Sequence, residues 1–167
     1  MSVAKIKAFS LIEVIITTAI LGILFGGIMV NMFNFKNKRQ VMSDAMLVAD
    51  FLTKVRTKAA AVEVPAGCTG ISDYQVGLDN DLVSGLGYFK ADVNCAVGSV
   101  LSYLPRQDLY SSKITLSPGG DIYFLANGKV SEAKEILICG QNGEEYRLEL
   151  FTTGAVEGPE YNGNCSF

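Results

Sequence analysis

The chain has 167 residues and no histidine, which excludes His-based catalytic triads and His-ligated zinc sites. Residues 1–63 hold eight basic and four acidic side chains, whereas residues 64–167 hold six and thirteen. The acidic second part repels phosphate backbones, so nucleic acid is an unfavourable partner for it.

Residues 1–8 form a short basic leader whose charged side chains are Lys5 and Lys7. An apolar run follows over residues 9–33, and about 24 helical residues reach roughly 36 Å, more than the ~30 Å hydrocarbon core of a bilayer. The run is too long for a secretory signal peptide, contains a carboxylate and is not followed by an A-x-A cleavage site. We therefore expect a membrane-spanning helix over residues 9–35.

Glu13 is the one charged residue between Lys7 and Lys36. A carboxylate inside an apolar span costs about 2.5–3.5 kcal/mol on insertion scales, so it needs a cationic partner. Cleavage between Ala8 and Phe9 would create an α-amine close to Glu13 that is mostly protonated near neutral pH. A neighbouring helix shifted along its axis could then pair both charges, which would fix the register between helices. The alternative is a Glu13 that reaches the lipid headgroups or pairs with Lys7 of an uncut chain.

The stretch KAFSLIEV at residues 7–14 resembles the prepilin motif of type IV pilins and type II secretion pseudopilins. The resemblance implies cleavage by a prepilin peptidase between Ala8 and Phe9, N-methylation of Phe9, and a role for Glu13 as the buried assembly carboxylate. Two positions depart from the family pattern. Ala8 stands where glycine is usual, and Val30 stands where many members carry a helix-kinking proline.

The same resemblance implies an α+β, pilin-like fold with a long N-terminal helix. Residues 9–35 would form its membrane-spanning and fibre-core half, and residues 36–64 its amphipathic half, packed on an antiparallel β-sheet head over residues 65–167. The implied partners are a membrane, other pilin or pseudopilin subunits, the prepilin peptidase and an inner-membrane assembly platform.

An apolar stripe supports the amphipathic half of the helix. Its members follow a 4-3-4-3 spacing, which places them on one helical face: Val41, Ala45, Val48, Leu52, Val55, Ala59 and Val62. Most charged side chains, Asp44 among them, are expected off this face. The stripe is expected to pack on the sheet of the head, with a coiled-coil partner as the alternative. Pro65 disfavours helix at Val64, so the helix is expected to end near Glu63.

The sequence after Pro65 alternates short β-favouring runs with Gly, Asn and Asp turns, which predicts an antiparallel sheet. The expected strands cover residues 74–78, 87–93, 100–104, 113–117, 121–125, 135–139 and 146–152. The stretches SPGGD and CGQNGEE are typical of hairpin connections.

Four cysteines lie in the head, and none belongs to a CxxC pair, so a structural zinc site is not expected. Their even number predicts two disulfides in an exported region. We favour Cys68–Cys95 and Cys139–Cys165, because each closes a short loop without crossing the other; each would stabilise the head by roughly 3–4 kcal/mol. Four buried free thiols are the alternative. Because the basic residues flank the apolar run on both sides, the cysteines decide the orientation, with the head outside the cytoplasm.

Residues 113–130 and 135–158 faintly resemble the H-type minor pseudopilins of type II secretion and related minor pilins. In those proteins a strand–Gly–strand unit precedes a last hairpin that ends in a Gly-containing turn.

Catalytic and metal sites are not expected in the head. Neither a nucleophile–base pair nor a Gly-rich phosphate loop before a helix is visible, so we interpret the chain as a non-enzyme without cofactors. Asp79, Asn80 and Asp81 offer clustered oxygens for calcium, but a polar turn is the preferred interpretation. The run of residues 157–164 is expected to be a solvated loop pinned by Cys165.

These observations favour a structural subunit of a type IV pilus or a type II secretion pseudopilus, incorporated into a cell-surface or periplasmic filament. One alternative is a permanently membrane-anchored extracytoplasmic binding domain that is not cut at Ala8. Another is a DNA-uptake (competence) minor pilin, which the acidic head disfavours.

Overall fold

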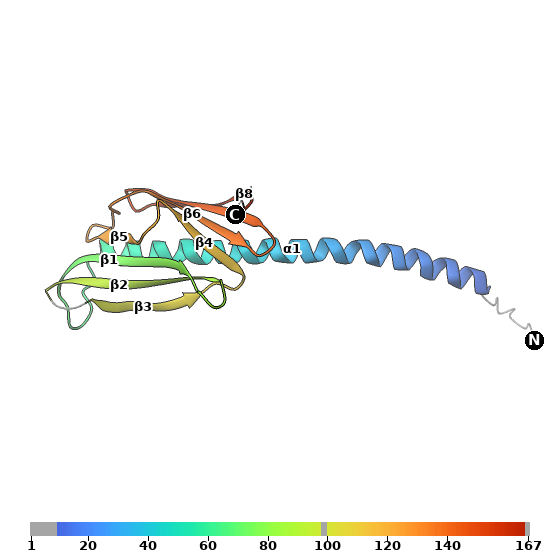
Figure 1. Cartoon of the computed structure of the whole chain (residues 1–167), viewed down its shortest axis with the longest axis horizontal. Coiled ribbons are helices and arrows are strands. Elements are labelled where there is room, and N and C mark those ends of the chain that lie inside the picture. Colours follow the sequence, from blue (N-terminus) through green and yellow to red (C-terminus); the bar gives the residue numbers. More distant parts are fainter. Residues whose placement is uncertain (1–9, 98–99, 166–167) are drawn as a thin grey trace, which may run out of the picture. The chain divides into compact units, whose positions relative to one another are not determined.

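The computed structural model describes residues 10–97 and 100–165, apart from the side chains of residues 26–31, 33 and 34 (Figure 1). The chain divides into two units, Met1–Lys36 and Asn37–Phe167, which are described separately. Helix α1, Leu11–Ala60, contributes to both, and the β-strands belong to the second unit. The observed class is α+β, with a helix followed by antiparallel sheets, as expected.

The helix begins one residue after Ser10, whose carbonyl accepts hydrogen bonds from the amides of Glu13 at 3.0 Å and Val14 at 3.3 Å. Ser10 and Glu13 have the S-x-x-E spacing of a capping box, a common start signal for helices. Phe9, the expected first residue of the helix, lies outside the described residues.

The helix ends at Ala60, three residues before the expected end at Glu63. Val62 adopts a left-handed conformation with φ of 50°, and its amide donates to the Ala59 carbonyl at 3.2 Å. The Glu63 amide donates to the Lys58 carbonyl at 3.3 Å, which completes a Schellman motif. The prediction was wrong because this cap stops the helix before the restriction imposed by Pro65 applies.

The strands form two four-stranded sheets rather than one. The first has the order β3-β2-β1-β5 and the second the order β4-β6-β7-β8, with antiparallel pairing throughout. The bounds are β1 Thr69–Asn80, β2 Gly87–Val97, β3 Leu101–Asp108, β4 Ser112–Ser117, β5 Ile122–Leu125, β6 Lys134–Gly140, β7 Glu144–Leu150 and β8 Val156–Asn164.

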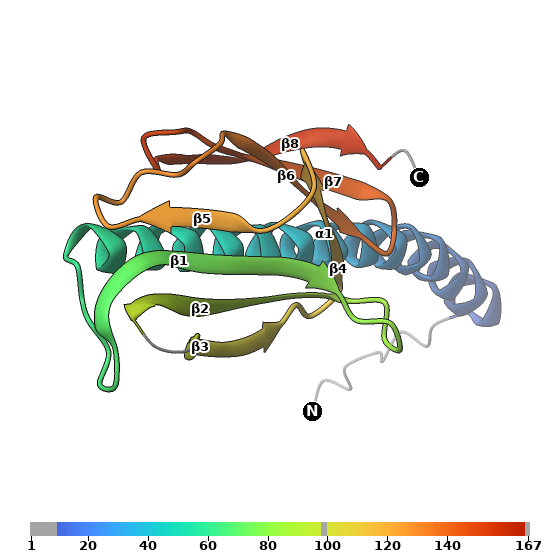
Figure 2. The same cartoon turned by 60° about the vertical axis from the view of Figure 1, so that its left-hand side comes forward.

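The part of α1 in the second unit lies between the two sheets, with β2 and β3 on one side and β6 and β8 on the other (Figure 2). Phe51 packs on Phe89 of β2, with ring centroids 4.6 Å apart. Gly140 of β6 faces Val41 so closely that any added Cβ would collide with the valine side chain. The helix therefore contacts both sheets, which explains why its apolar face is completely covered.

The predicted stripe is confirmed for its first six members, which are almost completely buried: Val41, Ala45, Val48, Leu52, Val55 and Ala59. Val62 was wrongly included, because it follows the end of the helix and is 46% exposed. Asp44 was wrongly placed off the buried face, since its side chain is fully buried.

Of the two expected hairpins, one is confirmed. The CGQNGEE stretch joins β6 to β7, with Cys139 opposite Glu145. The SPGGD stretch is not a hairpin, because β4 before it and β5 after it belong to different sheets. The C-terminal run expected as a loop is largely strand β8, which pairs with β7.

Both expected disulfides are present. Cys68 bonds to Cys95 with 5.4 Å between their Cα atoms, and Cys139 bonds to Cys165 with 6.0 Å. The first links the approach to β1 with β2, and the second links β6 with the residue that follows β8. The second disulfide thus ties the C-terminal end of the outer strand β8 to β6.

Candidate functional site

The first part of α1 is apolar on every face. Each side chain of residues 11–25 is exposed, including Leu11 at 81%, Ile23 at 78% and Phe25 at 64%. A helix that is apolar all round is stable only when lipid or protein surrounds it. This segment therefore needs an external apolar environment that its own unit does not supply.

The hydroxyl groups in this segment are satisfied within the helix. Thr17 donates to the Val14 carbonyl at 3.0 Å, and Thr18 donates to the carbonyls of Val14 and Ile15 at 2.9 and 3.0 Å. Such bonds let a threonine enter an apolar environment without an unpaired donor. The two threonines therefore do not require a polar partner.

Glu13 is different, because no residue of the segment offers it an opposite charge. It lies in the first turn of α1 with its side chain exposed. The helix N-terminus carries a partial positive charge, which favours a carboxylate at this position. That partial charge is much weaker than a full cation, so an apolar environment would still demand a partner for Glu13.

The predicted processing residues, Ala8 and Phe9, lie outside the described residues, so their position relative to Glu13 stays a prediction. Over the described part of the chain, no helix is both long enough and apolar enough to cross a membrane. The membrane-spanning half expected over residues 9–35 is therefore not confirmed.

The calcium candidates in the head have internal roles. The Asn80 side chain donates to the Ile114 carbonyl at 2.7 Å and accepts from the Ile114 amide at 2.8 Å, which ties β1 to β4. Asp81 pairs with Arg106 at 2.8 Å, and hydrogen bonds to the turn amides and to this guanidinium hold the pKa of Asp81 well below its usual range. The described residues contain no cluster of three or more side chains suited to a metal ion.

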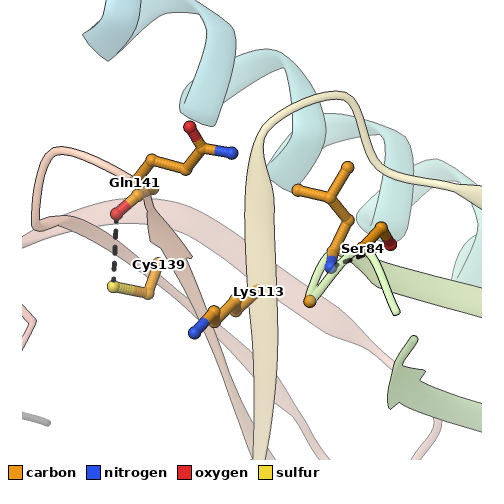
Figure 3. A pocket seen from close by; sticks show the side chains of 7 residues that line it. Ser84, Lys113, Cys139 and Gln141 are labelled. Carbon is orange, nitrogen blue, oxygen red and sulfur yellow. Dashed lines mark hydrogen bonds between the residues drawn. The ribbon is translucent and has the colours of Figure 1, made fainter. Parts of the chain in front are cut away.

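The depressions on the described surface of the head are shallow. One of about 210 Å³ lies between the β1–β2 turn and the sheet of β4 and β6, with Ser84, Lys113, Cys139 and Gln141 around it (Figure 3). Ligand pockets usually measure about 300–1,000 Å³, so this depression offers little enclosure for a small molecule.

Asp44 is a structural residue that the sequence analysis missed. Its carboxylate accepts hydrogen bonds from the Tyr110 amide at 3.2 Å, the Ser111 amide at 3.1 Å and the Ser112 hydroxyl at 2.7 Å. These bonds fasten the β3–β4 connection to α1. Its spacing of three residues from Val41 was the available signal, because that spacing places it beside the apolar stripe.

A second polar cluster fastens the end of α1. Lys58 donates to the Glu63 carboxylate at 2.7 Å and to the Tyr103 hydroxyl at 2.8 Å, and the Tyr74 hydroxyl donates to the Glu63 carbonyl at 2.7 Å. The hydrogen bond with Glu63 raises the pKa of Lys58 and lowers that of Glu63. Burial raises the pKa of Tyr74. The cluster links the Schellman cap to both β1 and β3.

One outer strand of each sheet, β3 or β8, is poorly suited to pairing with another chain. β3 contains Pro105 and β8 contains Pro159, and each of these strands has one partner in its sheet. Proline lacks an amide donor and interrupts a ladder, which is a common protection against edge-to-edge association. Edge-to-edge association through β3 or β8 is therefore disfavoured.

Comparison with known proteins found one family match. Residues 4–29 match the family described as the prokaryotic N-terminal methylation motif. No curated protein and no solved structure matches the chain. The match covers residues 4–8 of the expected leader, the expected cleavage position, Glu13 and the exposed apolar residues that follow. The chain therefore carries a prokaryotic N-terminal methylation motif, of the kind found in type IV pilin-like proteins, at residues 4–29.

Proposed function

We propose that this protein is a structural subunit of a type IV pilus or a type II secretion pseudopilus. A prepilin peptidase would remove residues 1–8, methylate Phe9 and release a subunit that is stored in a membrane. An assembly platform would then move the N-terminal helix from lipid into a fibre. The observation that carries the proposal is the single carboxylate, Glu13, at the start of a segment exposed and apolar on every face.

The proposed driving force for assembly is the transfer of this segment from lipid into a bundle of the same segments from other subunits. Apolar packing alone does not select a register, because lipid and protein cover such side chains about equally well. Glu13 supplies the selection. A buried carboxylate is tolerated only beside a cation, and the Phe9 amine of an adjacent subunit is the cation that processing would create.

The head is proposed to lie outside the cytoplasm. Disulfides persist mainly in oxidising compartments, and the two disulfides of the head, Cys68–Cys95 and Cys139–Cys165, hold separate sheets. Within the fibre the head would project from the helical core. We propose a structural rather than a catalytic role for it, without cofactor or nucleic acid, in line with its shallow surface and its acidic charge.

Replacement of the assembly carboxylate tests the proposal. Glu13→Gln keeps the size of the side chain but removes its charge, so it should prevent incorporation into filaments while the disulfides of the head still form. Thr17→Val is the matched control, because its hydroxyl bonds only to its own helix and its loss leaves the charge pattern intact. Shearing followed by immunoblotting measures incorporation. Glu13→Gln filaments as abundant as those of the control would contradict the proposed mechanism.

A further inference from the structure

Strand β8 contributes little to the apolar core of the head. All nine of its residues are described, and each of their side chains is half-buried or exposed. The neighbouring strand β7, by contrast, buries Tyr146, Leu148 and Leu150. The sequence of β8 includes two glycines, a proline and two asparagines, which are residues of low strand propensity. Hydrophobic burial and local preference therefore do little to hold β8 in place.

The backbone pairing of β8 is also irregular. Its register with β7 shifts between Glu145 and Tyr146, and again between Arg147 and Glu149. β8 is the outer strand of its sheet, so β7 is its one partner there. Pro159 has no amide to donate to a ladder. The hydrogen bonds of β8 are therefore formed on one side only and are interrupted along its length.

The side-chain contacts of β8 lie at the surface. Tyr161 is 50% exposed, and its ring meets that of Tyr146 edge-on with 5.6 Å between the centroids. The Lys38 ammonium lies 3.7 Å from the centroid of the Tyr161 ring. The Asn162 side chain donates to the Glu145 carboxylate at 2.6 Å. Water competes with exposed contacts of these kinds, so each of them is weak.

A covalent bond fixes the far end of this weakly held strand. Cys165 follows β8, and its disulfide partner Cys139 belongs to β6, which lies on the other side of β7. The near end of β8 is already held by the short connection from β7, in which the Phe151 amide donates to the Ala155 carbonyl at 2.9 Å. A segment fixed at both ends loses less conformational entropy on pairing than one with a free end. The disulfide therefore favours the paired state of β8.

We infer that the redox state of Cys139 and Cys165 controls whether β8 is paired with β7. β8 pairs when the disulfide forms and detaches when the disulfide is reduced. The other strands and α1 stay folded in both states, because the apolar core is built almost entirely from their side chains. Detachment exposes the backbone amides and carbonyls of β7 that β8 covers, which creates a free sheet edge. Oxidation is therefore the step that completes the second sheet.

The Cys68–Cys95 disulfide joins strands that do not depend on it in this way. It links the approach to β1 with β2. β1 buries Tyr74 and Val76 completely, and β2 buries Phe89 completely. Apolar burial therefore keeps these two strands in place when their disulfide is open. Removal of Cys68–Cys95 is accordingly the matched control for removal of Cys139–Cys165.

Thiols can reach the Cys139–Cys165 bond from the surface. Cys165 is partly exposed, and Cys139 lines the depression of about 210 Å³ (Figure 3). A thiolate of a dithiol reductant attacks the Cys165 sulfur and forms a mixed disulfide, while Cys139 leaves as a thiolate and takes up a proton. The second thiolate of the reductant then displaces Cys165, which is protonated in turn. The reductant is thereby oxidised to a disulfide, and a disulfide oxidant reverses both steps.

Hydrogen exchange followed by mass spectrometry tests the inference on the full-length protein in detergent micelles. One variant carries Cys139→Ser with Cys165→Ser, and the control carries Cys68→Ser with Cys95→Ser. Peptides that cover β8 should exchange about tenfold faster, or more, in the first variant than in the control, because local opening of β8 no longer breaks a closed loop. Peptides that cover β6 and the buried part of α1, residues 41–59, should exchange at the same rate in both.

Reduction of the control variant repeats the measurement without substitution of Cys139 or Cys165, whose bond is the one disulfide left in that protein. Dithiothreitol should accelerate the exchange of β8 to the same extent, and oxidised glutathione should restore its protection. Equal protection of β8 in both variants and after reduction would overturn the inference. Faster exchange of β6 and of residues 41–59 together with β8 would also overturn it, because the bond would then stabilise the whole head rather than one strand.

Discussion

The Asp44 carboxylate of α1 accepts a 2.7 Å hydrogen bond from the Ser112 hydroxyl at the first residue of β4. Both side chains are buried, and two amides of the β3–β4 connection donate to the same carboxylate. One polar residue on an otherwise apolar helix face thus fixes the connection between the two sheets. Its loss would leave several donors without an acceptor.

Asp44→Ala is therefore expected to lower the free energy of unfolding of the head by about 2–4 kcal/mol, since buried donors lose a charged acceptor. Asp50→Ala, at an exposed position of the same helix, should change it by less than about 0.5 kcal/mol. All seven tyrosines lie between Tyr74 and Tyr161, so urea unfolding followed by near-ultraviolet circular dichroism reports on the head. Equal effects of the two substitutions would show that the Asp44 contacts do not stabilise the head.

A substitution at Val62 is expected to have the opposite effect, an increase in stability. A β-branched residue in the left-handed region is strained by about 1–2 kcal/mol, and glycine adopts that conformation freely. Val62→Gly should therefore raise the free energy of unfolding by about 1 kcal/mol, after the entropy that glycine gains in the unfolded chain is subtracted. The comparison is Val64→Gly, where φ is not positive and glycine should not stabilise. A lower unfolding free energy for Val62→Gly in the same urea titration would contradict this account of the cap.

The β1–β2 turn should depend on pH through Asp81. The pKa of Asp81 is lowered in the folded protein by hydrogen bonds from the turn amides and from Arg106, so its ionised form stabilises the turn. That stabilisation is complete above the ordinary pKa of aspartate, near 4, and declines as the pH falls below it. Amide protection at Val83 and Ser84, corrected for intrinsic exchange, should be lower at pH 3 than at pH 6.

The matched variant for this experiment is Asp81→Asn, which cannot titrate. Its protection at Val83 should be weaker at pH 6 and the same at both pH values. Protection in the unaltered chain that does not fall between pH 6 and pH 3 would mean that the Asp81 charge does not hold the turn.

The helical elements could be predicted from the sequence because their signals are local and repeated. The 4-3-4-3 spacing from Val41 to Ala59 identified the buried face of α1, since few other structures satisfy that period. The disulfide pairing also followed from local distances along the chain, because the nearest cysteines bond in both cases. The end of the helix was less predictable, because a valine adopts the left-handed conformation usually given to glycine.

The arrangement of strands depends on contacts that are distant in sequence. Ser117 and Asp121 flank a glycine pair that is typical of a hairpin, yet the chain passes there from one sheet to the other. β8 was missed because Gly158, Pro159 and Gly163 give it the composition of a loop, and its pairing with β7 outweighs that local preference. The role of Asp44 likewise depends on a loop 66 to 68 residues away.

The candidate assembly segment could be predicted from the sequence because its signal is one continuous run. The run of residues 4–29 matches the methylation motif, and the described side chains from Leu11 to Phe25 are exposed. The pairing of Glu13 with a neighbouring amine involves a second copy of the chain, so it stays a prediction.

The pairing of Glu13 with a neighbouring amine depends on processing of the N-terminus. Mass spectrometry tests this processing, by intact mass and by N-terminal fragments of the subunit taken from native filaments. In the proposed mechanism, cleavage between Ala8 and Phe9 creates the α-amine that neutralises Glu13 in an adjacent helix. The expected result is a chain that begins at Phe9 and carries one methyl group on that nitrogen. Filament subunits that still begin at Met1 would contradict the proposed mechanism of assembly.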